Sequence, residues 1–166
     1  MTDPQPGAFQ RAVSTVLGEL VDGAAREMCW VLNPGDPGLL RSLERLSAAA
    51  ASAPAPGTGA SIAAHVDHLR YGLQLLNRWN RGEDPFGDAD YSASWRRVSV
   101  SDAEWRILRD QLRAEAHAWL EALREPRTLD EAHLAGTIAG VAHLAYHLGA
   151  IRQRDRALSG PPERER

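Results

Sequence analysis

The uncharged, mostly apolar stretch Leu134–Ile151 restricts the possible folds more than any other feature of the sequence. A membrane-spanning helix needs roughly 17–25 mostly apolar residues, so the eighteen residues of this stretch would just be long enough. However, the stretch contains His143, His147, Thr137 and three glycines, and its flanks carry no signals that orient a membrane helix. We therefore expect a helix that is buried on nearly all sides within a helical bundle.

Helical periodicity, interrupted by proline and glycine, divides the rest of the chain. Asn33–Gly38 and Ser52–Gly59 both combine proline with glycine, so neither segment continues a helix. No segment shows the alternation that is typical of a strand. We expect helices at 7–32, 39–51, 61–80, 101–124 and 130–158. This pattern predicts an all-α fold, a four-helix bundle in which a long crossover connects the two halves.

The length of 166 residues suits a single domain, which we place at residues 1–158, followed by a disordered tail at 159–166. Within the domain, Arg81–Val100 is expected to be a loop. Twenty irregular residues are too many for a passive connection in a compact domain, so we expect a lid or a wall of a site. Trp95 is the side chain of this loop that we most expect to contact a ligand.

The composition excludes several kinds of chemistry. All nineteen basic residues are arginines, so the chain cannot supply a lysine for a Schiff base or a P-loop. Cys29 is the single cysteine, which excludes an intrachain disulfide and a CxxC site. The net charge of -3 argues against nucleic-acid and membrane partners, and residues 1–10 do not resemble a targeting segment, so we expect a cytoplasmic protein.

Four of the six histidines form two short motifs on different predicted helices. His143 and His147 are four residues apart, which places both imidazoles on one helix face about 5–6 Å apart. A third histidine from a facing helix would complete a site with open coordination positions, as in catalytic metal centres. Both His65 and His68 are candidates for this ligand. Helical projection slightly favours His65, which lies nearer the main apolar stripe of its helix.

The two motifs together resemble the DinB/YfiT-like superfamily of helical bundles. The resemblance rests on SIAAHVDHL at Ser61–Leu69 and AHLAYHLGAIRQ at Ala142–Gln153, and it extends over Ser61–Arg156. It implies a four-helix bundle, a homodimer, and one divalent metal ion held by three histidines. The family's register maps the ligands onto His68, His143 and His147, with His65 as the alternate for the first ligand.

The resemblance also implies an activity. Relatives of this kind are thiol S-transferases and thiol-dependent isomerases that use bacillithiol, mycothiol or glutathione-like cofactors. We therefore expect a small-molecule substrate, a low-molecular-weight thiol as co-substrate, and zinc or nickel as the metal. Many family members carry glutamine at the position of Ala150, so any role of that glutamine is absent from this chain. No catalytic residue is assigned, and the alternative is a non-catalytic, stress-related binding or dimerisation module.

The remaining polar candidates are given structural roles. We expect Asp67 to be a solvated helix acid rather than a partner that orients an imidazole. Tyr71 and Tyr146 are assigned to packing, and Cys29 to the buried core. We expect His117 and His133 to be surface or capping residues, and Arg152–Arg156 to form an exposed, salt-bridged helix end.

Overall fold

The computed structural model describes residues 7–25, 28–54, 59–125 and 128–162. Within these ranges the chain is all-helical and contains no strand, which confirms the predicted all-α class. The α-helices are α1 (Ala8–Asp22), α2 (Gly38–Glu44), α3 (Ala48–Ala51), α4 (Ile62–Asn80), α5 (Asp102–Arg124) and α6 (Glu131–Arg154). Two short 3-10 helices, η1 (Ala93–Trp95) and η2 (Arg156–Leu158), accompany them.

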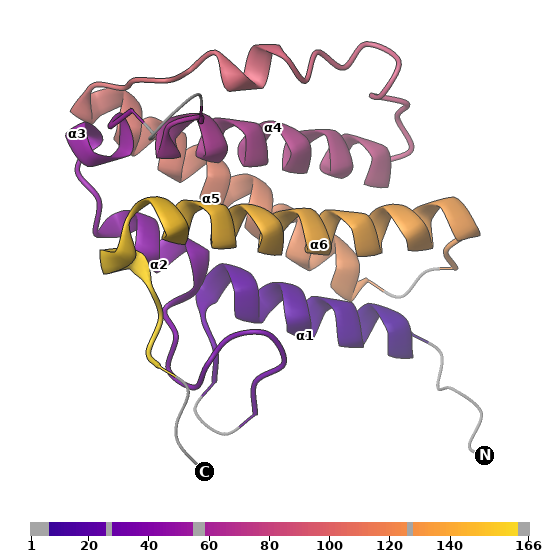
Figure 1. Ribbon diagram of the computed structural model, residues 1–166. Coiled ribbons are helices and arrows are strands. Elements are labelled where there is room, and N and C mark those ends of the chain that lie inside the picture. Colours follow the sequence, from indigo (N-terminus) through magenta and orange to yellow (C-terminus); the bar gives the residue numbers. More distant parts are fainter. Residues whose placement is uncertain (1–6, 26–27, 55–58, 126–127, 163–166) are drawn as a thin grey trace.

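The four long helices α1, α4, α5 and α6 pack together (Figure 1), and with α2 and α3 they supply the hydrophobic core. Helix α5 packs against α4 and α1, and α6 also packs against α4 and α1. Trp119 of α5 lies under Gly140 of α6, where an added Cβ would come within 2.7 Å of the indole ring. Glycine at this position therefore lets α6 approach the core closely.

The predicted starts of three long helices agree with the structure because each carries its own cap. The Ser61 hydroxyl accepts a hydrogen bond from the Ala64 amide at the start of α4. Ser101 and Glu104 form a complete capping box at the start of α5. Asp130 accepts a hydrogen bond from the His133 amide at the start of α6. Each cap satisfies an amide that would otherwise lack a partner.

The first and second predicted helices are too long. Helix α1 ends at Asp22 rather than Leu32, because Gly23 adopts φ 106° and lies against the backbone of Asp36. The following segment is held by Glu19, whose carboxylate accepts the amide hydrogens of Trp30, Val31 and Leu32. The predicted helix at 39–51 is divided into α2 and α3.

Helix α6 is not buried on nearly all sides, contrary to our expectation. Ile138 is 55 % exposed and Tyr146 is 69 % exposed. They belong to a larger set of exposed residues along α6: Ala135, Ile138, Ala139, Ala142, Tyr146 and Gly149. Among the described helices, α6 alone is long and apolar enough to cross a membrane, a test that core helices of soluble proteins also pass.

The structure describes part of the predicted tail. The carbonyl of Pro161 accepts a hydrogen bond from the side chain of Asn33, and Gly160 lies against Asp36. The first residues after η2 are therefore held against the segment between α1 and α2. Residues 163–166 lie outside the described ranges.

Candidate metal centre

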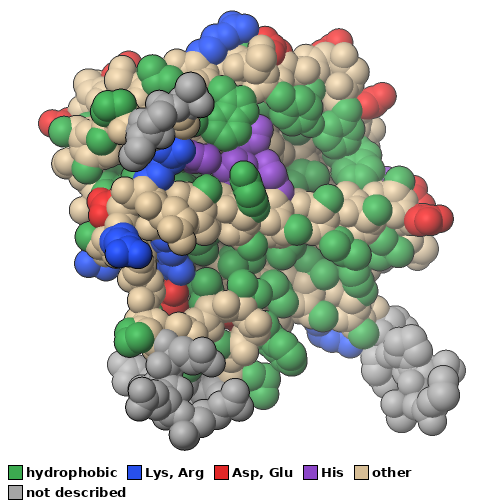
Figure 2. Space-filling view, viewed as in Figure 1, with side chains coloured by type: hydrophobic (Ala, Val, Ile, Leu, Met, Phe, Trp, Pro, Cys, Tyr) green, Lys and Arg blue, Asp and Glu red, His purple; other side chains and the backbone are tan. Residues whose placement is uncertain are grey.

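Three histidines from two neighbouring helices converge at one point. The Nε2 atom of His143 lies 3.1 Å from Nε2 of His68 and 3.0 Å from Nε2 of His147. One ligand atom from each of the three residues lies within 4.8 Å of the others. His68 comes from α4 and the other two from successive turns of α6, so the packing of α4 against α6 creates the cluster. Figure 2 shows histidine side chains at the surface, surrounded mainly by hydrophobic side chains.

The hydrogen bonds of Ser94 determine the tautomer of His68. The Ser94 hydroxyl donates to the carbonyl of Tyr91 at 2.7 Å, so its oxygen is free to accept. Nδ1 of His68 lies 2.9 Å from this oxygen and donates its hydrogen to it. The Nε2 atom of neutral His68 therefore carries a free lone pair, which points at His143 and His147.

His65 lies behind the cluster rather than within it. Its Nδ1 atom is 2.8 Å from Nδ1 of His147, on the side of that ring away from His143. The Nε2 atom of His65 is buried and has no partner. If His147 donates its Nδ1 hydrogen to His65, then Nε2 of His147 also presents a lone pair to the cluster. The structure thus brings His68 beside His143 and places His65, the alternate first ligand, where it can orient His147.

The environment keeps these imidazoles neutral at ordinary pH. Burial lowers the pKa of His65 and of His68 to about 4, and it lowers the pKa of His143 in the same direction. Burial, followed by the nearby His143, His65 and His68, lowers the pKa of His147 to about 3. Neutral imidazoles are the form that binds metal ions, so protons compete weakly for these nitrogens.

The predicted loop at 81–100 forms a wall of the site through η1. The indole of Trp95 stacks on His68 with ring centroids 4.3 Å apart, and its edge approaches His65 at 5.2 Å. Ser94, in the same short helix, holds His68 as described. This segment therefore covers one side of the cluster and supplies both an aromatic and a polar contact.

Asp67 anchors this segment and is not the solvated acid that we expected. Its carboxylate is buried, and it binds Arg70 at 2.8 Å and Arg97 at 3.0 Å. Arg97 follows η1, so this ion pair ties the loop to α4 beside the histidines. Helical periodicity could not show this, because the partner Arg97 is thirty residues away in the sequence.

The chain was compared with family models, with curated proteins and with solved structures. No match was found. The chemical interpretation of the cluster therefore depends on the residues themselves and on their geometry.

Three other assignments need correction. Cys29 is half-buried and donates to the carbonyl of Ala25, so it is not a core thiol. Tyr146 is largely exposed, with its ring edge-on to His147 at 5.1 Å. Arg152 does not lie on an exposed helix end, since it makes a paired contact with the buried carboxylate of Asp36.

The other two histidines remain outside the cluster. His117 pairs with Asp22 at 2.9 Å, and His133 stacks on Trp79 with centroids 4.2 Å apart. His133 also contacts Asp130 at the start of α6, as a capping residue would. Sequence reasoning missed Ser94 because nothing about a serine in this loop indicates a contact with α4.

The partners of the cluster lead to a first prediction. Replacing His65 with phenylalanine keeps the ring volume but removes the acceptor for the Nδ1 hydrogen of His147. Loss of such a partner typically lowers metal affinity by about 10- to 100-fold. We expect this loss for His65→Phe and for Ser94→Ala in a zinc competition titration. His117→Ala serves as the control. If its zinc affinity were as weak as that of the two variants, the roles of His65 and Ser94 in orienting the ligands would be contradicted.

The lowered pKa values also predict how the metal-free protein responds to acid. In the unfolded chain the histidines titrate near 6.5, whereas His65 and His68 titrate near 4 in the folded state. Between these values the unfolded chain binds more protons, so the free energy of unfolding decreases as the pH falls from about 6.5 to about 4. The decrease is at most about 1.4 kcal/mol per pH unit for each histidine. Urea unfolding of chelator-treated protein at several pH values measures it, and His65→Phe should give a shallower slope.

Proposed function

We propose that the protein is a metal-dependent enzyme in which His68, His143 and His147 bind one divalent ion, zinc or nickel. The observation that carries this proposal is the convergence of three Nε2 atoms with separations of 3.0 and 3.1 Å for two of the pairs. Nitrogens at the usual zinc distance in a tetrahedral site lie about 3.3 Å apart. The cluster therefore needs only small side-chain movements to hold an ion.

Hydrogen-bond arithmetic supports the same proposal. Nε2 of His143 faces two other Nε2 atoms, and the bond to Ser94 leaves the one on His68 without a hydrogen. A neutral His143 has one hydrogen at most for that nitrogen, so it cannot donate to both neighbours. No arrangement of hydrogens on these neutral rings gives each of the three Nε2 atoms a hydrogen-bond partner. A positive ion between them would accept the lone pairs of all three.

The chemistry follows from the number of ligands. Three protein ligands leave coordination positions open, and an ion held in this way lowers the pKa of a bound thiol or water. His143 is the exposed member of the cluster, so the open side faces the solvent and the adjoining pocket. Ser94 and His65 hold the rings of His68 and His147 in place.

We further propose a DinB/YfiT-like four-helix bundle and a thiol S-transferase activity. The two histidine motifs support this family, and the pairwise packing of α1, α4, α5 and α6 is compatible with it. The single cysteine, Cys29, lies in the segment between α1 and α2, away from the residues that contact the cluster. A reacting thiol would therefore arrive as a low-molecular-weight co-substrate.

One observation favours the second candidate, a non-catalytic binding or dimerisation module. The outer side of α6 exposes apolar residues such as Ile138, which a second copy of the chain could cover. The enzyme should turn over a substrate, whereas the non-catalytic module should not. Metal-loaded protein is incubated with bacillithiol, mycothiol or glutathione and a generic electrophile, and loss of free thiol is followed.

We expect metal-dependent transfer with at least one of these thiols. The activity should be lost in His143→Ala and kept in His117→Ala, which removes a histidine that pairs with Asp22 and is not part of the cluster. Absence of transfer with all three thiols contradicts the transferase assignment. The metal site itself is then judged by its metal content alone.

A further inference from the structure

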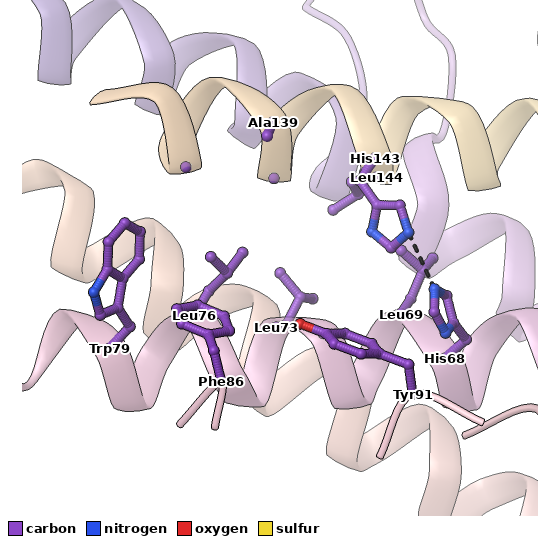
Figure 3. A pocket seen from close by; sticks show the side chains of 13 residues that line it. His68, Leu69, Leu73, Leu76, Trp79, Phe86, Tyr91, Ala139, His143 and Leu144 are labelled. Atoms are coloured by element: carbon purple, nitrogen blue, oxygen red, sulfur yellow. Dashed lines mark hydrogen bonds between the residues drawn. The ribbon is translucent and has the colours of Figure 1, made fainter. Parts of the chain in front are cut away.

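We propose that the pocket beside the histidine cluster binds the body of an elongated, uncharged apolar substrate whose single polar end lies at the histidines. The inference deepens the proposed function and depends on it for the role of the polar end. The pocket has a volume of about 660 Å³ and lies between α4, α6 and the segment at 81–100 (Figure 3). Its size suits a small organic ligand, since such sites enclose about 300–1,000 Å³.

The pocket is elongated along α4. His68 and His143 lie at one end and Trp79 at the other, with Leu73 and Leu76 between them (Figure 3). Trp79 follows His68 by eleven positions, which corresponds to about 16 Å along a helix. The shape therefore fits a chain or a row of rings better than a compact polar molecule.

Apart from the two histidines and the hydroxyl of Tyr91, the walls are apolar. On the α6 side the pocket is lined by small residues, Gly136, Ala139 and Gly140. A Cβ at Gly136 would overlap the ring of Trp79, so glycine at this position lets the indole close that end of the pocket. On the opposite side Phe86 and Tyr91 close it, and Phe86 meets the edge of Trp79 with centroids 5.4 Å apart. Contact with such walls stabilises apolar atoms in proportion to the area removed from water.

The absence of charged side chains in the pocket limits which part of a substrate can lie there. The two histidines are its basic residues, and the described residues that line it include no arginine, aspartate or glutamate. A carboxylate placed near Trp79 would therefore find no cationic partner among the lining residues. A glutathione-like thiol carries several charges, so the pocket suits the other reactant, an apolar electrophile. The polar end of that molecule then lies beside the Nε2 atoms of His68 and His143.

The test uses straight-chain alkyl hydroxamates, from butyl to dodecyl, whose head group binds divalent metal ions. Calorimetric titration of zinc-loaded protein should show the affinity rising about fourfold per added methylene. The rise should stop when the chain reaches Trp79. A chain of the same length with a terminal carboxylate should bind at least about tenfold more weakly.

Two matched variants examine the geometry. Ala139 and Ala135 are both exposed on α6, but only Ala139 lines the pocket. A phenylalanine at 139 points toward the N-terminus of α6 and thus toward Trp79. Ala139→Phe should therefore leave butyl hydroxamate unaffected and end the chain-length gain earlier. Ala135→Phe should behave like the wild type.

The outcomes separate this proposal from the proposed function. Equal affinities along the series in protein that holds zinc would overturn the apolar substrate and leave the metal site intact. If zinc is not retained, alkyl alcohols with the same range of chain lengths, from butyl to dodecyl, are titrated into metal-free protein. This titration shows whether the affinity rises with chain length. A gain then supports the pocket although the metal site fails. If Ala139→Phe changes only the oligomeric state, a second copy occupies this face and the proposal is wrong.

Discussion

Simultaneous replacement of His143 and His147 by alanine is expected to weaken zinc binding by about a thousandfold or more. The two residues supply two of the three Nε2 atoms of the cluster. Removing one residue that only orients a ligand already costs about 10- to 100-fold, so removing two ligands costs more. Competition with a zinc chelator of known affinity measures the change.

The fold should survive this double substitution. His143 is exposed, and His147, although buried, is not one of the residues that form the hydrophobic core cluster. His117→Ala is the matched control, because it removes a histidine that pairs with Asp22 instead. Zinc affinity that remains unchanged in the double variant would contradict the assignment of the ligands.

Replacement of Trp119 by alanine is expected to have the largest effect on stability. Trp119 is 1 % exposed and lies between α5 and α6, under Gly140. Truncation of a buried tryptophan typically lowers the free energy of unfolding by about 3–5 kcal/mol, because it loses apolar burial and leaves a cavity. Zinc affinity should fall as well, since this contact fixes the position of the helix that carries His143 and His147.

Trp30 offers the matched control for that prediction. It is 65 % exposed, so Trp30→Ala should change the free energy of unfolding by no more than about 0.5 kcal/mol. Urea denaturation of both variants and of the wild type gives the comparison. Similar stabilities of the two variants would show that the contact between Trp119 and Gly140 does not join α5 to α6 as described.

Local signals explain which parts of the fold are predictable from the sequence. Ser61, the Ser101–Glu104 box and Asp130 each cap a helix with their own side chains, so the starts of α4, α5 and α6 follow from neighbouring residues. The end of α1 cannot be predicted from neighbouring residues in this way. It depends on the close approach of Gly23 to Asp36, which is a contact between segments that helical periodicity cannot show.

The same distinction applies to the site. The spacing of His143 and His147 is sufficient to place both rings on one face of α6. Helical projection slightly favoured His65, but it cannot separate the two residues, because both are buried in a helix that has apolar neighbours on several sides. Only the packing of α4 against α6 and η1 shows that His68 faces His143 and that His65 lies behind His147.

The exposed side of α6 was unpredictable for a related reason. Alanine and glycine occur all around this helix, so its sequence has no polar face that would mark the solvent side. The homodimer implied by the family resemblance stays a prediction, and analytical ultracentrifugation of the wild type and of Ile138→Glu would test it. A dimer that dissociates in the variant is the expected result.

Elemental analysis of protein purified without a histidine tag tests the central claim most directly. The wild type, expressed in turn with supplements of zinc and of nickel, should contain one divalent ion per chain, and the His143→Ala/His147→Ala variant should contain none. A wild type that holds no stoichiometric metal under any of these supplements would contradict the claim that His68, His143 and His147 form a metal centre.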